Sequence, residues 1–297
     1  MPSNSPTIKP ETVHGAGALY VVATPIGNKD DITLRALRVL RNVDLIAAED
    51  TRKTRRLLAR HAIKGSFISY HEHNEDQRTP TLIKKLLSGS SVALVSNAGT
   101  PSVSDPGYRL IQTAISKKIN VIPIPGVSAA TAALSVAGLP TDTYVFVGFV
   151  SKRKSKRLKQ FTQLAAERRT IIFYESPKRI LSLLEEIIAT MADRQAVLAR
   201  EMTKLHEEFV RGSLAEILNI LKQRSDIKGE CTLVVAGRGA PQEVSWKTVR
   251  NEISSALELN REKISELAKR LAKKYDVPRK KIYDEALKFR GQRAEDR

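Results

Sequence analysis

The stretch Leu19-Tyr20-Val21-Val22-Ala23-Thr24-Pro25-Ile26-Gly27-Asn28 decides the fold class. Its residues 19–24 form a short apolar run, which predicts a buried strand. Pro25 and Gly27 then end that strand, because proline lacks the backbone N–H that a sheet uses and glycine favours turns. The strand is therefore expected to lead directly into a loop of small residues at its carboxyl end.

The same alternation of short apolar runs and amphipathic stretches continues along the body of the chain. It is typical of a mainly parallel sheet with crossover helices, and so predicts an α/β fold. Strands are predicted at residues 19–24, 45–48, 67–70, 92–96, 121–123, 170–174, 196–199 and 231–236. Helices are predicted at residues 33–41, 51–60, 80–88, 108–117, 129–136, 179–191 and 214–222.

Changes in composition divide the chain into four segments. They are a disordered leader at residues 1–17, an N-terminal α/β domain at 18–149, a C-terminal α/β domain at 150–240 and a three-helix module at 241–297. The leader is rich in Pro, Ser and Thr, and the module shows only helical periodicity. Its last two helices resemble a helix-turn-helix, for which plain packing and nucleic acid contact are equally good explanations.

The chain is strongly basic, with 50 Lys and Arg against 32 Asp and Glu and a net charge of +18 over 297 residues. Residues 241–297 hold only 15 basic and 10 acidic residues, so most of the surplus lies in the body. Such a surplus attracts polyanions. No apolar run reaches the roughly 18 residues that a membrane span needs, so we expect a cytoplasmic protein that does not enter a membrane.

Four loops dense in Gly, Pro, Ser and Thr follow predicted strands. They lie at residues 23–28, 96–107, 123–130 and 174–177. A single such loop often only turns the chain, but four at strand ends favour a cofactor site, because open α/β sheets bind ligands beyond the carboxyl ends of their strands. The chain has no phosphate-binding Walker loop, no Gly-x-Gly-x-x-Gly fingerprint and no His-Glu-x-x-His metal motif.

Two further features favour structure over chemistry. The single cysteine, Cys231, lies in an apolar run, which excludes an internal disulfide and indicates a buried thiol. His71 and His73 flank Glu72, but two histidines without a further ligand cluster do not predict a metal site.

Six ordered blocks carry a resemblance to a known family. They are residues 19–28, 47–52, 70–75, 98–107, 173–177 and 199–204. In this order they resemble the motifs of the bacterial 16S rRNA cytidine 2′-O-ribose methyltransferases, a family within the tetrapyrrole methylase superfamily. The resemblance covers about residues 19–237.

This resemblance implies a homodimer of two-domain tetrapyrrole-methylase-like subunits, with S-adenosylmethionine bound between the two α/β domains. It also implies methylation of a cytidine 2′-hydroxyl in the decoding region of 16S rRNA, within the small ribosomal subunit. Cofactor contacts are expected at Pro25, Asn97, Thr100, Ser128, Ala129, Tyr174 and Met202. The family usually has Asp where this chain has Asn97, which removes a negative charge near a cationic cofactor.

Methyl transfer to a hydroxyl is an in-line displacement, which requires positioning and benefits from a base but needs no metal. The candidate catalytic carboxylates are Glu49, Asp50, Asp105 and Glu175, and His71 and Glu72 are further candidates for the base. Asp50 is equally well explained as a helix cap, with Arg52 either solvated or at the RNA site.

The densest basic run contains Lys152, Arg153, Lys154, Lys156, Arg157 and Lys159. A charge run is usually a solvated face, but beside an RNA substrate it is better explained by contacts with phosphates. Three other protein classes stay open: a small-molecule tetrapyrrole methylase, a nucleic acid-binding protein without catalysis, and a dinucleotide-dependent oxidoreductase. The net charge disfavours the small-molecule methylase, and the four loops disfavour a binding protein without catalysis. The missing Gly-x-Gly-x-x-Gly fingerprint disfavours the oxidoreductase.

Overall fold

The computed structural model describes residues 17–239, 246–258, 263–275 and 277–295. The chain divides into two compact units, Met1–Gly237 and Arg238–Arg297, which are treated separately. The predicted leader at residues 1–17 lies outside the described residues except for Gly17. Within the described ranges, no helix combines the length and the apolar character that crossing a membrane requires.

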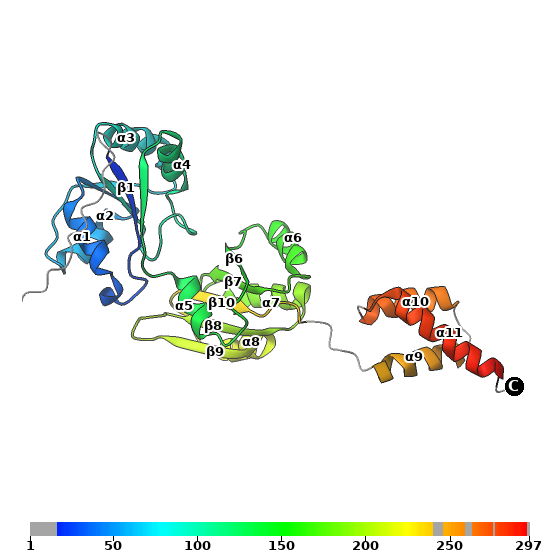
Figure 1. The fold of residues 1–297 in the computed structure, drawn as a ribbon. Coiled ribbons are helices and arrows are strands. Elements are labelled where there is room, and N and C mark those ends of the chain that lie inside the picture. The colour runs from blue at the N-terminus through cyan, green and yellow to red at the C-terminus, as the bar shows by residue number, and fades with distance from the viewer. Residues whose placement is uncertain (1–16, 240–245, 259–262, 276, 296–297) are drawn as a thin grey trace, which may run out of the picture. The chain divides into compact units, whose positions relative to one another are not determined.

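The first unit opens with a five-stranded, fully parallel sheet in the order β3-β2-β4-β1-β5. Figure 1 labels β1 of this sheet together with the helices α1 to α4 around it. Its strands are β1 (Ala18–Val22), β2 (Leu45–Ala48), β3 (Phe67–Ser69), β4 (Val92–Val95) and β5 (Asn120–Ile124). Side chains alternate along each strand, so Tyr20 and Val22 pack on one face and Leu19 on the other. The apolar runs in the sequence reflect this burial on both faces.

Two pairs of helices cover this sheet. The helices α1 (Leu34–Asn42) and α2 (Thr51–Ala59) share one core with it, and α3 (Glu75–Leu87) and α4 (Tyr108–Ser116) share the other. A short 3₁₀ turn, η1 (Lys29–Asp31), precedes α1. The predicted start of α3 at Pro80 is wrong, because the helix begins at Glu75 and accommodates Pro80 in its interior.

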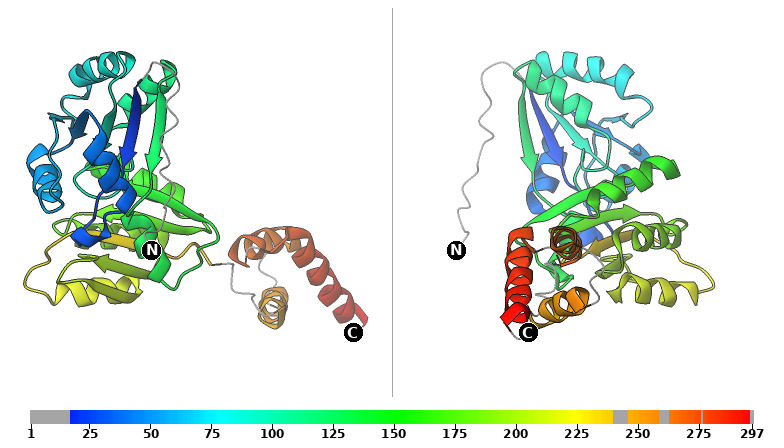
Figure 2. Two further views of the ribbon diagram at one scale, coloured as in Figure 1. Left: turned by 60° about the vertical axis from the view of Figure 1, so that its left-hand side comes forward. Right: turned by 90° about the vertical axis from the view of Figure 1, so that its right-hand side faces the viewer.

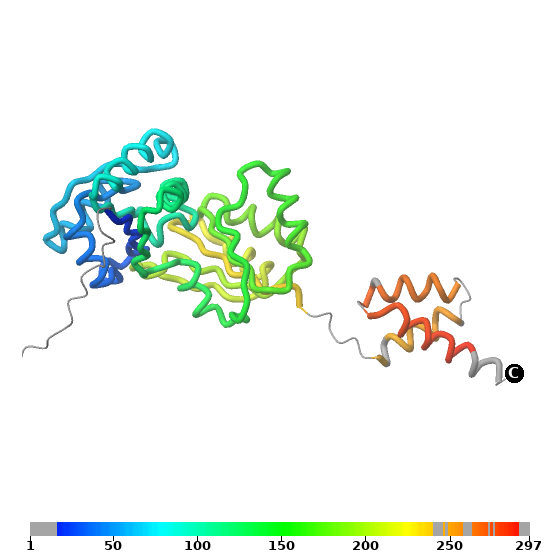
Figure 3. The backbone as a smooth tube through the Cα atoms, turned by 45° about the horizontal axis from the view of Figure 1, so that its top comes forward, coloured from blue at the N-terminus to red at the C-terminus, as the bar shows by residue number. Residues whose placement is uncertain are grey.

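The second sheet of this unit is mixed, in the order β6-β7-β10-β8-β9. Its strands are β6 (Tyr144–Phe149), β7 (Thr170–Glu175), β8 (Gln195–Arg200), β9 (Glu208–Ser213) and β10 (Cys231–Val235). Only β6 and β7 pair in parallel; the other neighbours are antiparallel. The expectation of mainly parallel pairing is therefore wrong for this sheet. Figure 3 shows β10, in yellow, among the green strands.

Helices also cover both faces of the second sheet. On one face lie α6 (Lys154–Leu164), α7 (Ile180–Met191) and α8 (Leu214–Lys222), and on the other lies α5 (Ala129–Val136). Because α5 and β6 both belong to this second half, the predicted domain boundary at residues 149/150 is wrong. The chain leaves the first sheet at Ile124, and the basic run after Phe149 leads into α6 and is not a linker.

The second unit is helical, as the sequence predicts for the end of the chain. It contains α9 (Trp246–Glu258), α10 (Ile264–Tyr275) and α11 (Arg279–Glu295), coloured orange to red in Figure 2. Val249, Ile253, Leu267, Leu271 and Ile282 are fully buried between the helices. The unit therefore has a hydrophobic core of its own, and the contact-based division between the units lies just after Gly237.

Candidate active site

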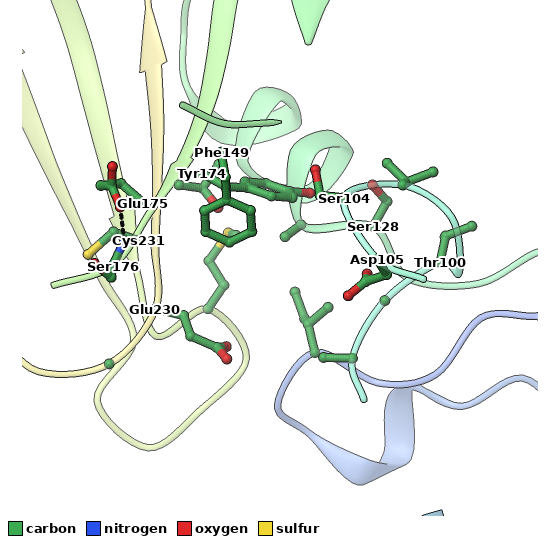
Figure 4. Close-up of a pocket in the computed structure, with 18 of the residues that line it drawn as sticks. Thr100, Ser104, Asp105, Ser128, Phe149, Tyr174, Glu175, Ser176, Glu230 and Cys231 are labelled. Atoms are coloured by element: carbon green, nitrogen blue, oxygen red, sulfur yellow. Dashed lines mark hydrogen bonds between the residues drawn. The ribbon is translucent and has the colours of Figure 1, made fainter. Parts of the chain in front are cut away.

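A cavity of about 290 Å³ lies in the first unit, where loops from both sheets meet (Figure 4). Part of its wall is apolar and consists of Ile26, Ala98, Val103, Ala129, Phe149 and Met202. The polar part includes Thr100, Ser104, Asp105, Ser128, Glu175 and Glu230. This volume lies near the lower limit for small-molecule sites, which measure roughly 300–1,000 Å³.

Backbone pairing fixes the loops that follow β1 and β4 against each other. The N–H of Thr24 donates to the carbonyl of Gly99 at 2.8 Å, and the N–H of Gly99 donates back to the carbonyl of Thr24 at 2.9 Å. Gly99 has a φ of +77°, a left-handed conformation that favours glycine. The Thr100 hydroxyl donates to the carbonyl of Val127 at 3.2 Å, which adds the loop after β5 to the same frame.

The loop between β4 and α4 carries unusual backbone geometry. Ser102 and Ser104 both have a φ of +66°, a left-handed conformation that residues other than glycine rarely adopt. The end of the loop is held by Glu75, whose carboxylate accepts a hydrogen bond from the N–H of Gly107 at 2.8 Å. Strained conformations of this kind persist only where surrounding contacts enforce them, and they concentrate at functional sites.

Tyr174 connects the second sheet to the start of α5. Its hydroxyl accepts a hydrogen bond from the N–H of Ala130 at 2.9 Å, and its ring packs edge-on against Phe146 and Phe149 at centroid distances of 5.0 and 5.6 Å. Burial raises the pKa of the Tyr174 hydroxyl above its ordinary value. The residue therefore stays neutral near pH 7 and fixes one wall of the cavity.

Asp105 is the carboxylate whose environment is most unusual. Burial, followed by the negative charges of Glu49 and Glu230, raises the pKa of Asp105 to about 7. Among the residues that the structure describes, none donates a hydrogen bond to this carboxylate or forms an ion pair with it. Asp105 therefore lies on the cavity wall with a pKa near neutral pH.

The other three candidate carboxylates have partners. Glu175 is 3% exposed, pairs with Arg179 at 2.5 Å and accepts the N–H of Ser176 at 2.7 Å. Glu49 accepts the N–H of Asn97 at 3.0 Å. These contacts occupy both side chains in holding the structure.

Asp50 is the N-cap of α2, where it accepts the N–H of Arg52 at 2.9 Å and pairs with the Arg52 side chain at 3.1 Å. These hydrogen bonds lower the pKa of Asp50 to about 2. The helix-cap interpretation is the one that the geometry supports. Arg52 itself stays 88% exposed.

The basic run beyond Phe149 is not uniform. Lys152, Arg153, Lys154 and Lys156 are exposed, and so is Lys159. Arg157 instead points inward, where it makes hydrogen bonds of 2.5 and 2.7 Å with Glu186. The expectation that Arg157 contacts RNA is therefore wrong, since its guanidinium is occupied inside the fold.

The cavity wall suits a compact cation with an apolar part. Asp105 and Glu230 contribute carboxylates, as does Glu175, which is paired with Arg179. The described residues of the wall include no lysine or arginine, in a chain of net charge +18. S-adenosylmethionine carries a sulfonium, an ammonium and an aromatic base. The donor set therefore fits this cofactor by charge and by its apolar surfaces.

The family model for Tetrapyrrole (Corrin/Porphyrin) Methylases matches residues 18–218. The chain belongs to this family. The match covers the first α/β half and the second as far as α8, and the second, helical unit lies outside it.

Relatives from within the methylase family match nearly the whole chain. "Ribosomal RNA small subunit methyltransferase I" of Halalkalibacterium halodurans is 42% identical over 273 residues, covering 90% of this chain and 94% of its own. The protein of the same name from Synechocystis sp. is 43% identical over 276 residues, covering 92% and 98% respectively.

Solved structures of tetrapyrrole methylases share the fold at much lower identity. The methyltransferase CobJ superposes with a TM-score of 0.58 at 18% identity, covering 77% of this chain and 98% of its own. A uroporphyrin-III C-methyltransferase from Thermus thermophilus, solved with S-adenosylhomocysteine, gives a TM-score of 0.53 at 18% identity, covering 74% and 97%. These likenesses establish the two-sheet architecture.

The structure brings seven of the predicted site residues of this methylase to one cavity: Thr100, Asp105, Ser128, Ala129, Tyr174, Glu175 and Met202. Pro25 is buried next to Ile26, which lines the wall, and Asn97 precedes Ala98, which also does. The side-chain oxygen of Asn97 is buried without a hydrogen-bond partner among the described residues.

Sequence reasoning did not identify Phe149 or Glu230, although both line the cavity. Phe149 ends β6, a strand that the sequence pattern did not predict. Its position just ahead of the basic run could have indicated a residue near the RNA. His71, a further candidate for the base, instead contacts Asn74 at 3.1 Å. Within the described part of the chain, no three His, Cys, Asp or Glu side chains group in a way that could hold a metal ion.

Proposed function

We propose that this protein transfers a methyl group from S-adenosylmethionine to the 2′-hydroxyl of a cytidine in the decoding region of 16S rRNA. The observation that carries this proposal is an acidic cavity at the strand ends of a basic tetrapyrrole methylase. Relatives that match over nine-tenths of the chain bear the name of ribosomal RNA small subunit methyltransferases. The acidic wall suits a cationic cofactor, and the basic surplus suits an RNA substrate.

Thr100, Ser128, Ala129, Tyr174 and Met202, all of which line the cavity, would hold the cofactor. Pro25 and Asn97, the other two expected cofactor contacts, directly precede Ile26 and Ala98 of the same wall. When bound, S-adenosylmethionine supplies a methyl group whose bond to sulfur breaks as a bond to the acceptor oxygen forms, leaving S-adenosylhomocysteine. The apolar wall excludes water from this exchange, and the carboxylates attract the positive charge of the sulfonium.

Asp105 serves as the general base. A ribose hydroxyl is a weak nucleophile while protonated, and a carboxylate with a pKa of about 7 can take up that proton at neutral pH. Glu49, Asp50 and Glu175 are less suited to this role, because each is already hydrogen-bonded within the protein. Asp105 would hold the proton that the hydroxyl gives up.

RNA phosphates contact the exposed basic residues Lys152, Arg153, Lys154 and Lys156 beside the cavity. Arg52, which is 88% exposed, is a further contact at the first sheet. Such contacts position the RNA but carry no sequence information. We infer that the substrate is the small ribosomal subunit and that the active protein is a homodimer, as the family resemblance implies.

The test combines a binding assay with a labelling assay. Calorimetry with S-adenosylhomocysteine should give saturable heat, and labelled S-adenosylmethionine should label 16S RNA in small subunits that lack the modification. The label should resist alkali at the linkage that follows the modified nucleotide, because 2′-O-methylation blocks cleavage there. Label found only on a base, or on an added uroporphyrin and not on RNA, would contradict the proposal.

A further inference from the structure

Among the large apolar residues of the cavity wall, Phe149 has the most solvent-exposed side chain. It is 55% exposed, whereas Met202 on the same wall is 8% exposed. An aromatic ring left half in solvent at the edge of a ligand cavity offers an uncommitted surface for stacking. The proposed function does not use it.

A bulge in β6 turns Phe149 toward the cavity. Phe146 pairs with Ile172, but the register then shifts, so that Gly148 pairs with Phe173 and Phe149 with Tyr174. In a regular strand, alternation would place residue 148 opposite Tyr174. The extra residue therefore gives Phe149 the position on the same face as Tyr174, which is a recognised use of bulges beside functional sites.

Glycine at position 148 makes this arrangement possible. Gly148 has a φ of +68°, and a Cβ placed on it would lie 2.5 Å from the Ser104 hydroxyl oxygen. The loop that carries Ser104 and Asp105 therefore packs directly against the bulge. Figure 4 shows the Phe149 ring and the Asp105 carboxylate on opposite sides of the open centre of the cavity.

The ring of Phe149 packs against the ring of Tyr174. Tyr174 meets it edge-on, at an interplanar angle of 64° and a centroid distance of 5.6 Å. Tyr174 is fixed in turn by Phe146 and by the N–H of Ala130. A ring braced in this way can receive a flat partner without first losing conformational freedom.

The chain beyond Phe149 continues directly to the exposed basic residues. Lys152 and Arg153 follow three and four residues later, within about 10–14 Å of extended chain. An RNA strand that contacts these side chains through its phosphates thus passes the mouth of the cavity. Combined charge and stacking of this kind is how proteins hold unpaired nucleotides.

We propose that Phe149 is the platform on which the base of the acceptor nucleotide stacks after that nucleotide has turned out of its RNA, with Asp105 facing the ribose. The ligand class is an unpaired nucleoside of a polynucleotide, and the inference rests on the proposed function. The adenine of the cofactor is the competing occupant. It is better matched by Ile26 and Met202, which line the same cavity and are both 8% exposed.

The test measures cofactor affinity and RNA methylation separately in Phe149→Ala, Phe149→Leu and Phe149→Tyr. The control is Tyr144→Ala, because Tyr144 is a 43% exposed aromatic residue on the same strand that does not line the cavity. The readouts are the Kd for S-adenosylhomocysteine by calorimetry and kcat/KM on small subunits that lack the modification. The salt dependence of RNA binding is measured in parallel.

Loss of one stacked base is expected to lower kcat/KM by about 5- to 150-fold in the Ala and Leu variants. The Tyr variant and the Tyr144→Ala control should stay within about threefold of the wild type, and the Kd and the salt slope should be unchanged in all variants. A parallel rise in the Kd of the Ala variant would assign the ring to the cofactor. A fully active Leu variant would show that position 149 needs only an apolar side chain and not an aromatic ring. Either result would overturn the inference.

A wild-type protein that binds S-adenosylhomocysteine but labels no RNA would instead overturn the proposed function. That outcome is visible before any variant is compared. The two failures are therefore distinguishable.

Discussion

Arg157 binds Glu186 through two hydrogen bonds of 2.5 and 2.7 Å, and so ties the start of α6 to α7. Both side chains are largely buried, at 12% and 13% exposure. The same guanidinium also donates to the carbonyl of Ser151 at 2.9 Å. An arginine within a basic run is thus a structural residue, whereas its neighbours face solvent.

Replacing Arg157 with Gln should therefore destabilise the first unit by roughly 2–4 kcal/mol, because Glu186 is left unpaired in a largely buried position. Arg153→Gln, which removes the same charge from an exposed side chain, should change stability by less than about 0.5 kcal/mol. Urea unfolding monitored by circular dichroism measures both. Equal effects from the two substitutions would contradict the structural role of Arg157.

The four exposed basic residues should control binding of RNA. Changing Lys152, Arg153, Lys154 and Lys156 together to Gln should lower the affinity for a 16S RNA fragment and reduce its log–log salt slope by up to about 3. The matched control changes Lys84, Lys85, Lys117 and Lys118. These are exposed residues at the helix ends opposite the strand ends that face the cavity. If both variants lose the same slope, the run has no special role.

Asp105 should set the pH dependence of methyl transfer. Because the carboxylate must be ionised to accept a proton and its pKa is about 7, kcat/KM should rise about tenfold per pH unit below pH 7 and level off above it. Asp105→Asn should lower kcat/KM by about 10²–10⁴-fold and abolish this dependence. A variant that keeps the wild-type profile would assign the base elsewhere.

The same residue should also affect folding. A pKa raised in the folded state means that the native protein holds its proton more tightly than the unfolded chain, so stability falls as the pH rises from about 4 to about 7. Asp105→Asn removes this penalty and should raise the urea midpoint at pH 8 but not at pH 4. The shape of the difference with pH separates this effect from a general change in packing.

Glu208 should act on stability in the opposite sense. Hydrogen bonds, first from Arg224 and then from Arg200, lower the pKa of Glu208 to about 2. The stabilisation is complete above the ordinary pKa of about 4.5 and disappears as the pH falls through about 2. Glu208→Gln should cost about 1–2 kcal/mol at pH 7 and nothing near pH 2, as measured by unfolding at each pH.

Cys231 should be unreactive in the folded protein. It is 4% exposed, and burial raises the pKa of its thiol to about 12. Iodoacetamide should modify it only after addition of denaturant, because the thiolate is the reactive form. Rapid alkylation at pH 8 without denaturant, detected by mass spectrometry, would contradict the burial of this thiol.

The sequence predicts the fold well where a strand is buried along its whole length. The parallel strands β1, β2 and β4 are apolar throughout, and their continuous runs mark them clearly. The edge strand β9 was not predicted, because Glu208 and Arg211 interrupt its apolar pattern. The boundary was misplaced because the change in charge after Phe149 marks the start of α6, whereas the first sheet ends at Ile124.

The sequence predicted which loops form the site more reliably than it predicted which of their residues line the cavity. Thr100, Ser128 and Tyr174 lie in loops or strand ends that the Gly and Pro pattern already singled out. The orientation of Phe149 depends on one left-handed glycine and a shifted register, which no periodicity reveals. Asp105 differs from the other candidate acids because they have hydrogen-bond partners and it has none in the described ranges. These partners are brought together by the tertiary structure, so the sequence alone does not reveal them.

The central place of β10 in the second sheet has a consequence for the order of folding. Residues up to Ile124 contain all five strands of the first sheet, which can therefore close while the rest of the chain is still being synthesised. The second sheet leaves a gap between β7 and β8 until Cys231–Val235 emerges. Until then, β7 and β8 each lack the neighbour that β10 provides, and unpaired strand edges of this kind can pair with other chains.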